Sequence, residues 1–488
     1  MSTEIAPPDV YTAYLQSKKD KIRSFYDREA TLYASKWISK NSYYYEQIKR
    51  LIATIVPPGK RVLDIGCGIG HILAHTRPAY GVGIDFSASM IAEARLRYPH
   101  LTFHTMEIEA ASELNEKFDF VISANSITEM TDIRRCLKSV YRVMTPETRL
   151  VIIAYNYLWQ PLIELGARLG MRPQSPTENW LTPQDIHGLL SSTDFEMVRD
   201  GYRTMLPRRV PLLSALLNNF LVRMPLFRHL GFTYYTVARP LIPFENPEKL
   251  TVSVVVPCKN EEGNIEGVAN RVPEMGGGTE LIFVDDKSTD TTAEKIKKQI
   301  ERHPEKNIKI VEGPGIGKGA ACRAGFAVAR NDVFMILDAD LTVMPEVLPE
   351  FFELIIKGKG EFINGSRLLY PMEEEAMRIA NIIGNKLFAM LFTFILEQPI
   401  KDTLCGTKVI LKRDYHKILE AREYFNSTDK WGDYDWIFGA ARNNLKIIEL
   451  PVHYVSRKAG QTKMTGRLKN AWIMLKMCWV AFLKLKLT

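Results

Sequence analysis

Two successive series of short apolar segments alternate with amphipathic ones along the chain. The first series of apolar segments comprises residues 61–65, 81–85, 118–123 and 149–153, and amphipathic stretches such as 89–97 and 133–143 lie between them. The second comprises residues 251–256, 281–284, 308–311 and 333–337. Strands that alternate with helices in this way are typical of a parallel sheet with helices on both faces. We therefore predict an α/β protein with two nucleotide-binding-type domains in series.

A proline-rich segment separates the two series. Pro240, Pro243 and Pro247 fall within nine residues, which indicates a linker. We place this linker at residues 241–250, between a domain at 1–240 and a domain at 251–465, and we assign residues 466–488 to a terminal helix. The length of 488 residues leaves room for two or three domains with full cores.

The net charge of the chain lies entirely in its last 32 residues. The chain has 64 Lys and Arg against 56 Asp and Glu, for a formal charge of +8, and eight of the basic residues but none of the acidic ones lie between 457 and 488. Without that segment 56 basic residues face 56 acidic ones, so the segment predicts a local anionic partner.

The terminal segment also has the pattern of an interfacial helix. On a helical wheel Lys469, Lys476 and Lys484 share an arc of about 80°, whereas Trp472 and Trp479 lie elsewhere. Lysines that extend from an apolar helix in this way suit an anionic membrane surface. The alternative is a final helix packed on its own domain. Residues 379–396 are amphipathic as well, and they predict a second contact with a membrane surface.

Composition excludes several classes of protein. Hydrophobic residues make up 46% of the chain, which excludes a disordered chain. The six cysteines form no C-x-x-C pair, which argues against a disulfide scaffold or a zinc site and fits a reducing cytosol. The N-terminus has no signal-like sequence, and no apolar run approaches 18 residues. We expect a cytoplasmic protein, peripherally associated with the cytoplasmic face of a membrane.

The first series contains a strand that runs into a glycine turn. Its sequence is Val62-Leu-Asp64-Ile-Gly66-Cys-Gly68-Ile-Gly70, and Asp85 ends the next strand. Glycines let a backbone approach a ligand closely, and an acid at the end of the second strand can accept hydrogen bonds from ribose hydroxyls. His71 occupies the third-glycine position of the dinucleotide pattern.

With its preceding acid, this turn resembles that of class I S-adenosylmethionine-dependent methyltransferases, and the resemblance covers about residues 40–240. It implies that Asp64, Gly66, Gly68 and Gly70 hold the amino-acid end of S-adenosylmethionine and that Asp85 holds its ribose. Two positions depart from the family pattern. Pro146-Glu147-Thr148 replaces a Pro-Gly-Gly turn, and either Met106 or Glu107 stands at the acidic adenine position. The alternative is a degenerate fold kept as a scaffold.

The methyl-acceptor side is less defined by the sequence. Methyl transfer from a sulfonium needs mainly positioning, with a base only for a neutral hydroxyl acceptor. Glu129 is our candidate base, and a solvated loop glutamate is the alternative. Residues 155–230 are rich in Trp, Leu, Met and Pro. We interpret them as a cap over the acceptor, with a plain helical insertion as the alternative.

The second series places polar residues at the ends of its strands. Asp338-Ala-Asp340 follows a strongly apolar strand, so both carboxylates are expected at the carboxyl edge of the sheet, where ligands bind. Paired carboxylates repel unless a cation separates them, and Mg²⁺ or Mn²⁺ there would bridge to phosphates. The Gly317-Lys318 pair is not a P-loop, because Gly319 replaces the Ser or Thr and Glu312 occupies the first glycine position.

These motifs, in this order, resemble GT-A family-2 glycosyltransferases of the dolichol-phosphate mannosyltransferase type across about residues 250–465. The resemblance implies a UDP- or GDP-linked sugar donor and a metal bound by Asp338 and Asp340, with Thr342 in place of a frequent glutamine. It implies contacts to the base and ribose from Pro257, Glu261 and Asp285 or Asp286, and it places Lys318 near the nucleotide. It further implies that Arg367 lies near the donor phosphates, that Asp402 shapes the acceptor side, and that Arg457 and Lys463 surround phosphates.

The reaction would be an in-line displacement at the anomeric carbon of the sugar. A lipid-phosphate acceptor arrives ionised and needs no strong base, whereas a hydroxyl acceptor does. Asp433 and Asp435 are the candidate bases, and capping of a helix at residues 436–441 is the alternative for one of them.

The leading hypothesis is a bifunctional enzyme that joins an S-adenosylmethionine-dependent methyltransferase to a metal-dependent, inverting glycosyltransferase. Its partners would be a nucleotide sugar, a polyprenyl phosphate or other lipid-linked acceptor, and an anionic membrane, with no nucleic acid. One alternative makes the first domain a non-catalytic cofactor sensor. The other is a nucleic-acid-binding protein that uses the basic tail, although aromatic residues interleaved for base stacking are missing from the sequence.

Overall fold

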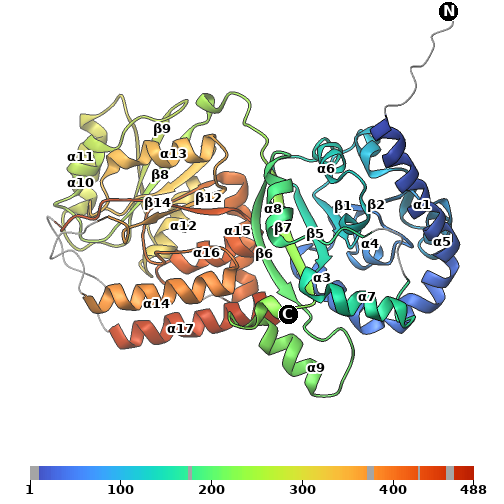
Figure 1. The fold of residues 1–488 in the computed structure, drawn as a ribbon. Helices are drawn as coiled ribbons and strands as arrows, with labels where there is room; N and C mark the ends of the chain where they lie inside the picture. The colour runs from blue at the N-terminus through green and yellow to red at the C-terminus, as the bar shows by residue number, and fades with distance from the viewer. Residues whose placement is uncertain (1–9, 174–177, 371–378, 427–428, 458–466, 488) are drawn as a thin grey trace, which may run out of the picture. The chain divides into compact units, whose positions relative to one another are not determined.

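The computed structural model describes residues 10–173, 178–370, 379–426, 429–457 and 467–487 (Figure 1). The chain divides into two compact units, Met1–Ile242 and Pro243–Thr488. The division lies inside the segment 241–250 that the prolines single out as a linker.

The first unit is built on a sheet of seven described strands in the order β3-β2-β1-β4-β5-β7-β6. Strands β1 to β5 run parallel, whereas β7 is antiparallel to both β5 and β6. The strands are β1 (Arg61–Ile65), β2 (Tyr80–Asp85), β3 (Thr102–Thr105), β4 (Phe120–Ala124), β5 (Arg149–Tyr155), β6 (Phe195–Arg203) and β7 (Thr233–Pro240).

Helices cover both faces of this sheet, because its strand residues alternate between two apolar clusters. Val62 and Ile122 pack on one side with α3, α4 and α5, while Leu63 and Val121 pack on the other with α6 and α8. The helices are α1 (Val10–Leu32), α2 (Ile38–Lys40), α3 (Ser42–Ile55), α4 (His71–His75), α5 (Ala88–Arg97), α6 (Ile133–Tyr141), α7 (Gln160–Arg168), α8 (Pro183–Ser191) and α9 (Leu213–Ala215).

The second unit has its own sheet of seven described strands, in the order β10-β9-β8-β11-β13-β12-β14. Strands β10, β9, β8 and β11 are parallel, β13 is antiparallel to β11 and β12, and β14 is parallel to β12. The strands are β8 (Val252–Cys258), β9 (Thr279–Asp285), β10 (Asn307–Glu312), β11 (Val333–Ile336), β12 (Phe362–Ser366), β13 (Lys408–Leu411) and β14 (Ile447–Pro451).

The two faces of this second sheet are also covered by helices. Val254 and Met335 pack with α10, α11 and α13, whereas Val255 and Phe334 pack with α12 and with α14 to α17. The helices are α10 (Ile265–Arg271), α11 (Thr292–Arg302), α12 (Lys318–Val328), α13 (Leu348–Ile356), α14 (Ile379–Leu396), α15 (Lys412–Phe425), α16 (Asp433–Arg442) and α17 (Arg467–Phe482).

The α/β class with two sheets is confirmed, and three features differ from the sequence-based expectation. Both sheets are mixed rather than parallel, because later strands return antiparallel beside β5 and β11. The region 155–230 is neither only a cap nor only a helical insertion, since β6 joins the sheet. Pro240, one of the three prolines that indicated the linker, still pairs with Phe195 of β6, so it belongs to the sheet and the linker at 241–250 follows it.

The terminal helix α17 packs against its own unit by one face. Met474, Cys478 and Ala481 are buried in the same apolar cluster as residues of α14, and α14 and α17 lie side by side in Figure 1. Within the residues described, no helix combines the length and apolar character needed to cross a bilayer.

Candidate active sites

In the first unit, the turn after β1 depends on three glycines in the left-handed region. Their φ angles are 69° at Gly66, 50° at Gly68 and 77° at Gly70. A Cβ atom at Gly66 would lie 2.5 Å from Cβ of Ser126, and one at Gly70 would lie 2.7 Å from the ring of Phe103, whereas one at Gly68 would meet nothing within 4 Å. Two of the glycines therefore permit close packing, and the third leaves open space for a ligand.

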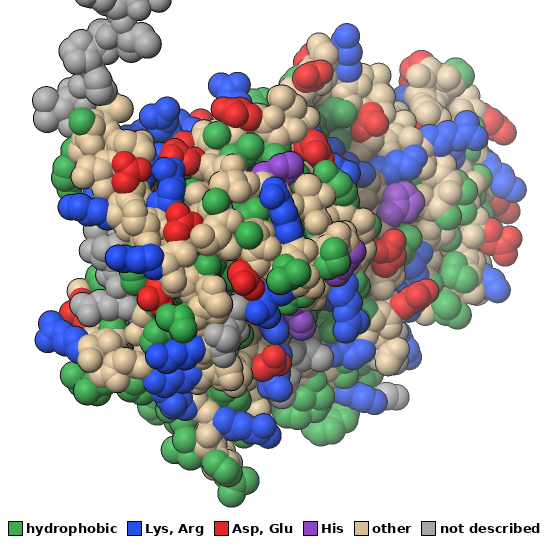
Figure 2. All heavy atoms as spheres, turned by 90° about the vertical axis from the view of Figure 1, so that its right-hand side faces the viewer, with side chains coloured by type: hydrophobic (Ala, Val, Ile, Leu, Met, Phe, Trp, Pro, Cys, Tyr) green, Lys and Arg blue, Asp and Glu red, His purple; other side chains and the backbone are tan. Residues whose placement is uncertain are grey.

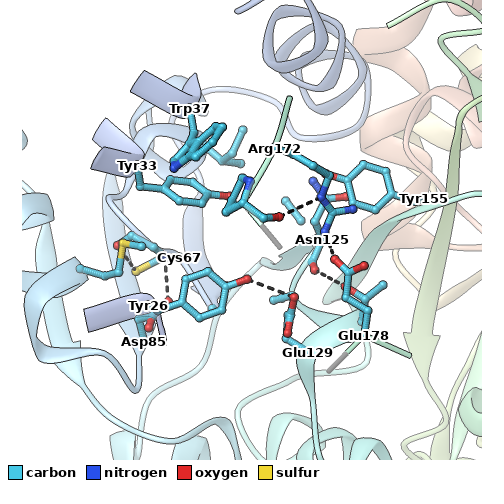
Figure 3. Close-up of a pocket in the computed structure, with 18 of the residues that line it drawn as sticks. Tyr26, Tyr33, Trp37, Cys67, Asp85, Asn125, Glu129, Tyr155, Arg172 and Glu178 are labelled. Atoms are coloured by element: carbon cyan, nitrogen blue, oxygen red, sulfur yellow. Dashed lines mark hydrogen bonds and ion pairs between the residues drawn. The ribbon is translucent and has the colours of Figure 1, made fainter. Parts of the chain in front are cut away.

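This turn borders a cavity of about 370 Å³. Figure 3 shows the rings of Tyr26, Tyr33, Trp37 and Tyr155 around it. The lining comes from the N-terminal helices, from the ends of β1, β2, β4 and β5, and from α7. A cavity of this size, mostly apolar with a few polar groups, is typical of a small-molecule site.

Two buried carboxylates line the cavity beside the glycine turn. Asp85 accepts hydrogen bonds from the N–H groups of Gly68 and Ser87, both at 2.9 Å. Oδ2 of Asp64 is buried and has no hydrogen-bond partner among the described residues. Burial, reinforced by the charge of Asp85, raises the pKa of Asp64 to about 7, and burial raises the pKa of Asp85 to about 6.

An unpartnered buried carboxylate oxygen is costly unless a ligand supplies a donor. The ammonium group of S-adenosylmethionine is such a donor. Asp64, the open space at Gly68 and the acid at the end of β2 therefore fit this cofactor, as the resemblance implied.

His71, which the sequence marked only as a departure from the dinucleotide pattern, begins α4 and lines the cavity. Both of its ring nitrogens are buried without a hydrogen-bond partner in the described part of the chain. Burial, aided by Lys49, lowers the pKa of His71 to about 3. The imidazole is therefore neutral, and it can offer one donor and one acceptor to a ligand.

Glu129 also lines the cavity, so the structure does not support the alternative of a solvated loop glutamate. The hydroxyl of Tyr26 donates to Oε1 of Glu129 at 3.1 Å, and nearby Arg172 forms an ion pair with Glu178 (Figure 3). Sequence reasoning named neither Tyr26 nor the Arg172–Glu178 pair. They come from α1 and from the segment after α7, far from any motif.

Of the two candidates for the adenine position, Glu107 lines the cavity and Met106 does not. The carboxylate of Glu107 forms ion pairs with Lys19 at 2.7 Å and Arg23 at 2.8 Å. Although burial raises the pKa of Glu107, the hydrogen bonds and charges of Lys19 and Arg23 together outweigh burial and hold this pKa below its usual range.

In the second unit, both carboxylates after β11 are engaged by cations. Oδ1 of Asp338 lies 2.6 Å from Nζ of Lys318, and Oδ2 of Asp340 lies 2.7 Å from a guanidinium nitrogen of Arg457. Burial disfavours the charge on Asp338, but Lys318, with the charges of Lys408 and Arg367, outweighs burial and holds the pKa of Asp338 below its usual range. The predicted residues Lys318, Asp338, Asp340 and Arg457 are thus brought together in two ion pairs, whereas Lys463 lies outside the described residues.

Two more ion pairs act on this site. Nζ of Lys408 lies 2.7 Å from Asp433, and Arg367 holds Asp402 through two nitrogens at 2.7 and 2.9 Å. The site is crowded, since a Cβ atom at Gly406 would fall 1.9 Å from Oδ2 of Asp338. Asp402 therefore neutralises Arg367, which is not an unpaired cation available to donor phosphates.

The two candidate bases are both buried in ion pairs, Asp433 with Lys408 and Asp435 with Arg422 at 2.9 Å. Neither caps the helix, because α16 begins at Asp433, three residues earlier than expected. Asp429 accepts the N–H groups of Tyr434 at 2.8 Å and Asp435 at 3.2 Å instead. Asp429 lies two residues before the Trp431–Trp436 motif, and the sequence pattern did not single it out.

The predicted nucleotide contacts lie near the ends of β8 and β9. Pro257 belongs to β8 itself. The carboxylate of Glu261 accepts a hydrogen bond from Asn264 at 2.8 Å. Asp286 accepts N–H groups of Gly315 and Gly317, so it holds the glycine loop, whereas Asp285 ends β9 and is only half-buried.

The residues that would hold Mg²⁺ or Mn²⁺ are the carboxylates of Asp338 and Asp340. The hydroxyl of Thr342 donates to Asp340 at 2.8 Å, and no cluster of three or more His, Cys, Asp or Glu side chains suited to a metal occurs in the described ranges. Two carboxylates that share a metal with substrate phosphates form a usual Mg²⁺ site, so the donor set fits a metal that binds together with a diphosphate.

Asp402→Asn is expected to lower the free energy of unfolding by about 3 kcal/mol, because it leaves the buried Arg367 guanidinium without its counterion. Urea denaturation at pH 7 measures this change. The exposed Glu301→Gln on α11 serves as control, and equal stability of the two variants would contradict the role of the pair.

Taken together, the two sheets define two α/β units, each with a candidate site at the carboxyl edge of its sheet. Residues 62–147 match the family model of a methyltransferase domain, and residues 253–419 match that of glycosyl transferase family 2. The chain therefore carries a methyltransferase domain and a family 2 glycosyltransferase domain.

Individual proteins resemble one unit or the other. A dolichol-phosphate mannosyltransferase from Pyrococcus furiosus is 30% identical over 222 residues, which are 45% of this chain and 60% of that protein. A dolichyl-phosphate beta-glucosyltransferase from Trichomonas vaginalis is 28% identical over 250 residues, which are 48% of this chain and 74% of that protein. The solved structure of a SAM-dependent methyltransferase from Thermotoga maritima matches 45% of this chain and 99% of its own at 15% identity and a TM-score of 0.35.

Proposed function

We propose that the chain is a bifunctional enzyme. Its second unit transfers a sugar from a UDP- or GDP-linked donor to a polyprenyl phosphate or other membrane-associated acceptor, and its first unit transfers a methyl group from S-adenosylmethionine. The observation that supports sugar transfer best is the set of four carboxylate–cation pairs at the edge of the second sheet, two of which include Asp338 and Asp340.

The burial of both candidate bases favours a phosphate acceptor over a hydroxyl. Asp433 and Asp435 are committed to Lys408 and Arg422, so neither is free to take a proton. A phosphate oxygen that is already ionised attacks the anomeric carbon without a base while the bond to the nucleoside diphosphate breaks. Both relatives are named for transfer to a dolichol phosphate, which agrees with this choice.

The departing diphosphate would be stabilised by Lys318 and Arg457, which now neutralise Asp338 and Asp340. Mg²⁺ or Mn²⁺ held by the two aspartates supplies further positive charge to the leaving group when bound. We assign the base and ribose contact to Asp285, together with Pro257 and Glu261, because Asp286 is occupied with the glycine loop.

Methyl transfer would take place in the cavity of the first unit. Asp64 and Asp85 hold the cofactor, which supplies an electrophilic methyl group when bound. Glu129, oriented by Tyr26, is in position to accept a proton if the methyl acceptor is a hydroxyl or an ammonium. If the first unit only senses the cofactor, S-adenosylmethionine binds but no methylated product forms.

A membrane-bound acceptor requires the second unit to work at a bilayer. Trp472 and Trp479 of α17 are 72% and 59% exposed, and Leu387 and Met390 of the neighbouring helix α14 are also exposed. Lys484 and Lys486 instead bind protein groups, the carbonyl of Tyr424 and the carboxylate of Glu397. Two basic residues of the tail are thus engaged within the protein, whereas Lys476 is exposed on α17 together with the two tryptophans.

Trp472→Ser combined with Trp479→Ser is expected to weaken binding of the full chain to phosphatidylglycerol-containing vesicles roughly tenfold, because two apolar anchors are lost. Vesicle co-sedimentation measures this change, with Leu96→Ser, an exposed leucine on α5, as the matched control. Unchanged binding would exclude α17 as a membrane contact.

The most informative experiment for the whole proposal is a ligand screen. The full chain with Mn²⁺ is heated with each UDP- and GDP-sugar, and separately with S-adenosylmethionine, because a ligand that binds only the folded state raises its stability. A melting-temperature increase with one nucleotide sugar and with S-adenosylmethionine is expected. No increase with any nucleotide sugar would reject the transferase assignment.

A further inference from the structure

The first unit has an apolar helix face that no described residue covers. Leu158, Leu162, Leu165 and Leu169, at or beside α7, recur at the spacing of one helical stripe, and they are exposed, Leu162 by 59%. The opposite side of the helix is anchored by the buried Ile163. An amphipathic helix in a globular protein normally packs such a stripe against the core. The exposed stripe of α7 therefore indicates a surface that binds a partner.

A second apolar segment projects next to α7. Around α9, Leu212 is 89% exposed and Leu226 is 80% exposed, and Leu216 and Phe220 are also exposed. The base of this segment is held firmly, since the Asn218 amide both donates to and accepts from the backbone of Leu206 at 2.8 Å. The exposed leucines therefore belong to a segment that is fixed at its base.

The two segments adjoin each other and the mouth of the cavity. The indole N–H of Trp159, just before α7, donates to the carbonyl of Leu230, just after the projecting segment, at 3.0 Å. Leu162 lines the cavity although it is largely exposed, and Arg208 lines it from the other segment. One continuous rim thus joins the exposed leucines to the entrance of the methyltransferase cavity.

The projecting segment of this rim carries only positive charge. Between residues 201 and 244 the chain has no Asp or Glu, while Arg208, Arg209 and Arg228 are exposed. Figure 2 shows hydrophobic side chains covering the lowest projection, which is the α9 segment by its place in Figure 1, with Lys and Arg side chains just above it. An apolar tip that extends beyond a belt of arginines suits a bilayer with anionic head groups, because the leucines can enter the acyl boundary while the guanidinium groups meet phosphates.

We propose that this rim is a membrane-docking surface of the first unit, and that it places the mouth of the methyltransferase cavity against the head groups of an anionic bilayer. The methyl acceptor is then the head group of a membrane-anchored molecule, which enters the cavity while its lipid remains in the bilayer. The identity of the acceptor rests on the proposed methyltransferase function, whereas the docking surface itself does not. A soluble acceptor would not require an apolar rim.

The test uses a fluorescent probe on the rim of the full chain. All six native cysteines are buried, so Leu216→Cys can be labelled selectively with an environment-sensitive fluorophore, and Leu96→Cys on α5 serves as the matched exposed control. Vesicles of phosphatidylcholine with phosphatidylglycerol are expected to raise the emission at position 216 several-fold and to leave position 96 unchanged, with a smaller rise on phosphatidylcholine alone. Leu212→Asp with Leu216→Asp is expected to lower the vesicle partition coefficient roughly tenfold or more.

Four outcomes would separate the possibilities. No response of the probe at position 216 to vesicles would overturn the docking surface, and so would a response that follows protein concentration without vesicles, which would show that a second copy covers the rim. If the Leu212→Asp, Leu216→Asp variant keeps its stabilisation by S-adenosylmethionine, its loss of vesicle binding is not due to misfolding and supports the surface. Absence of stabilisation by S-adenosylmethionine in the unmodified chain would overturn the methyl-acceptor assignment alone.

Discussion

Asp338→Asn is expected to reduce sugar transfer by the full chain about 1,000-fold. The amide removes one of the two carboxylates that would hold the metal, and it leaves Lys318, now 2.6 Å from Asp338, without its counterion. Transfer from the nucleotide sugar identified in the ligand screen to a polyprenyl phosphate, followed with a radiolabelled sugar, measures the loss.

The controls for this variant distinguish loss of chemistry from loss of fold. Glu301→Gln, an exposed carboxylate on α11, should transfer sugar at the wild-type rate. Asp338→Asn should also keep the melting-temperature increase with S-adenosylmethionine, because Asp338 lies in the other unit. Activity within about tenfold of the wild type would contradict the assignment of Asp338 to the leaving-group site.

Asp64→Asn is expected to weaken the binding of S-adenosylmethionine about 100-fold or more, because the ammonium group loses a buried ionised partner. The same change should stabilise the ligand-free protein at pH 8. The pKa of Asp64 is raised to about 7 in the folded state, against about 4 for an unfolded aspartate. Above pH 7 the wild type must therefore keep a buried charge.

The sign of the pH dependence follows from proton binding. Between about pH 4 and pH 7 the folded state holds a proton at Asp64 that the unfolded state has lost, so stability falls as the pH rises through this range. Asparagine removes this loss, which we estimate at roughly 2–4 kcal/mol above pH 7. Calorimetric titration and urea denaturation at pH 5 and pH 8 measure the two effects, with the exposed Glu113→Gln as control. A variant that binds the cofactor as the wild type does, or that is less stable at pH 8, would contradict this role.

The sequence predicts the location of those site residues that belong to a short motif. Asp64, Gly66, Gly68 and Gly70 follow one strand directly, and Asp338 and Asp340 follow another, so local order alone carries them to a sheet edge. Their partners could not be found in this way. Arg457 reaches Asp340 from more than 100 residues away, and Lys408 on β13 reaches Asp433 at the start of α16.

The methyl-acceptor side was the least predictable part. Tyr26 comes from the first helix, and Arg172 follows α7. Neither lies in a motif, and both reach the cavity only because β-strands and helices far apart in the chain pack together. The strands β6 and β7 were missed for a similar reason. They pair antiparallel at an edge where the alternation of strands and helices has already ended.

The exposed leucines around α7 and α9 illustrate a further limit. In sequence, Leu158, Leu162 and Leu165 follow the pattern of a helix that packs inward, and only the structure shows that this face is uncovered. The terminal segment shows a mixed case. Lys476 is exposed on α17, as the predicted membrane contact requires, whereas Lys486, just after that helix, forms a buried ion pair with Glu397 that the helical wheel does not indicate.

The central claim is that one chain holds two separate active sites. Isothermal titration calorimetry of the full chain with S-adenosylmethionine, and separately with the nucleotide sugar and Mn²⁺, tests this claim most directly when repeated on Asp64→Asn and Asp338→Asn. We predict one equivalent of each ligand for the wild type, loss of only S-adenosylmethionine binding in Asp64→Asn, and weakening of only nucleotide-sugar binding in Asp338→Asn. Loss of both ligands from a single variant, or of neither from both variants, would contradict two separate sites.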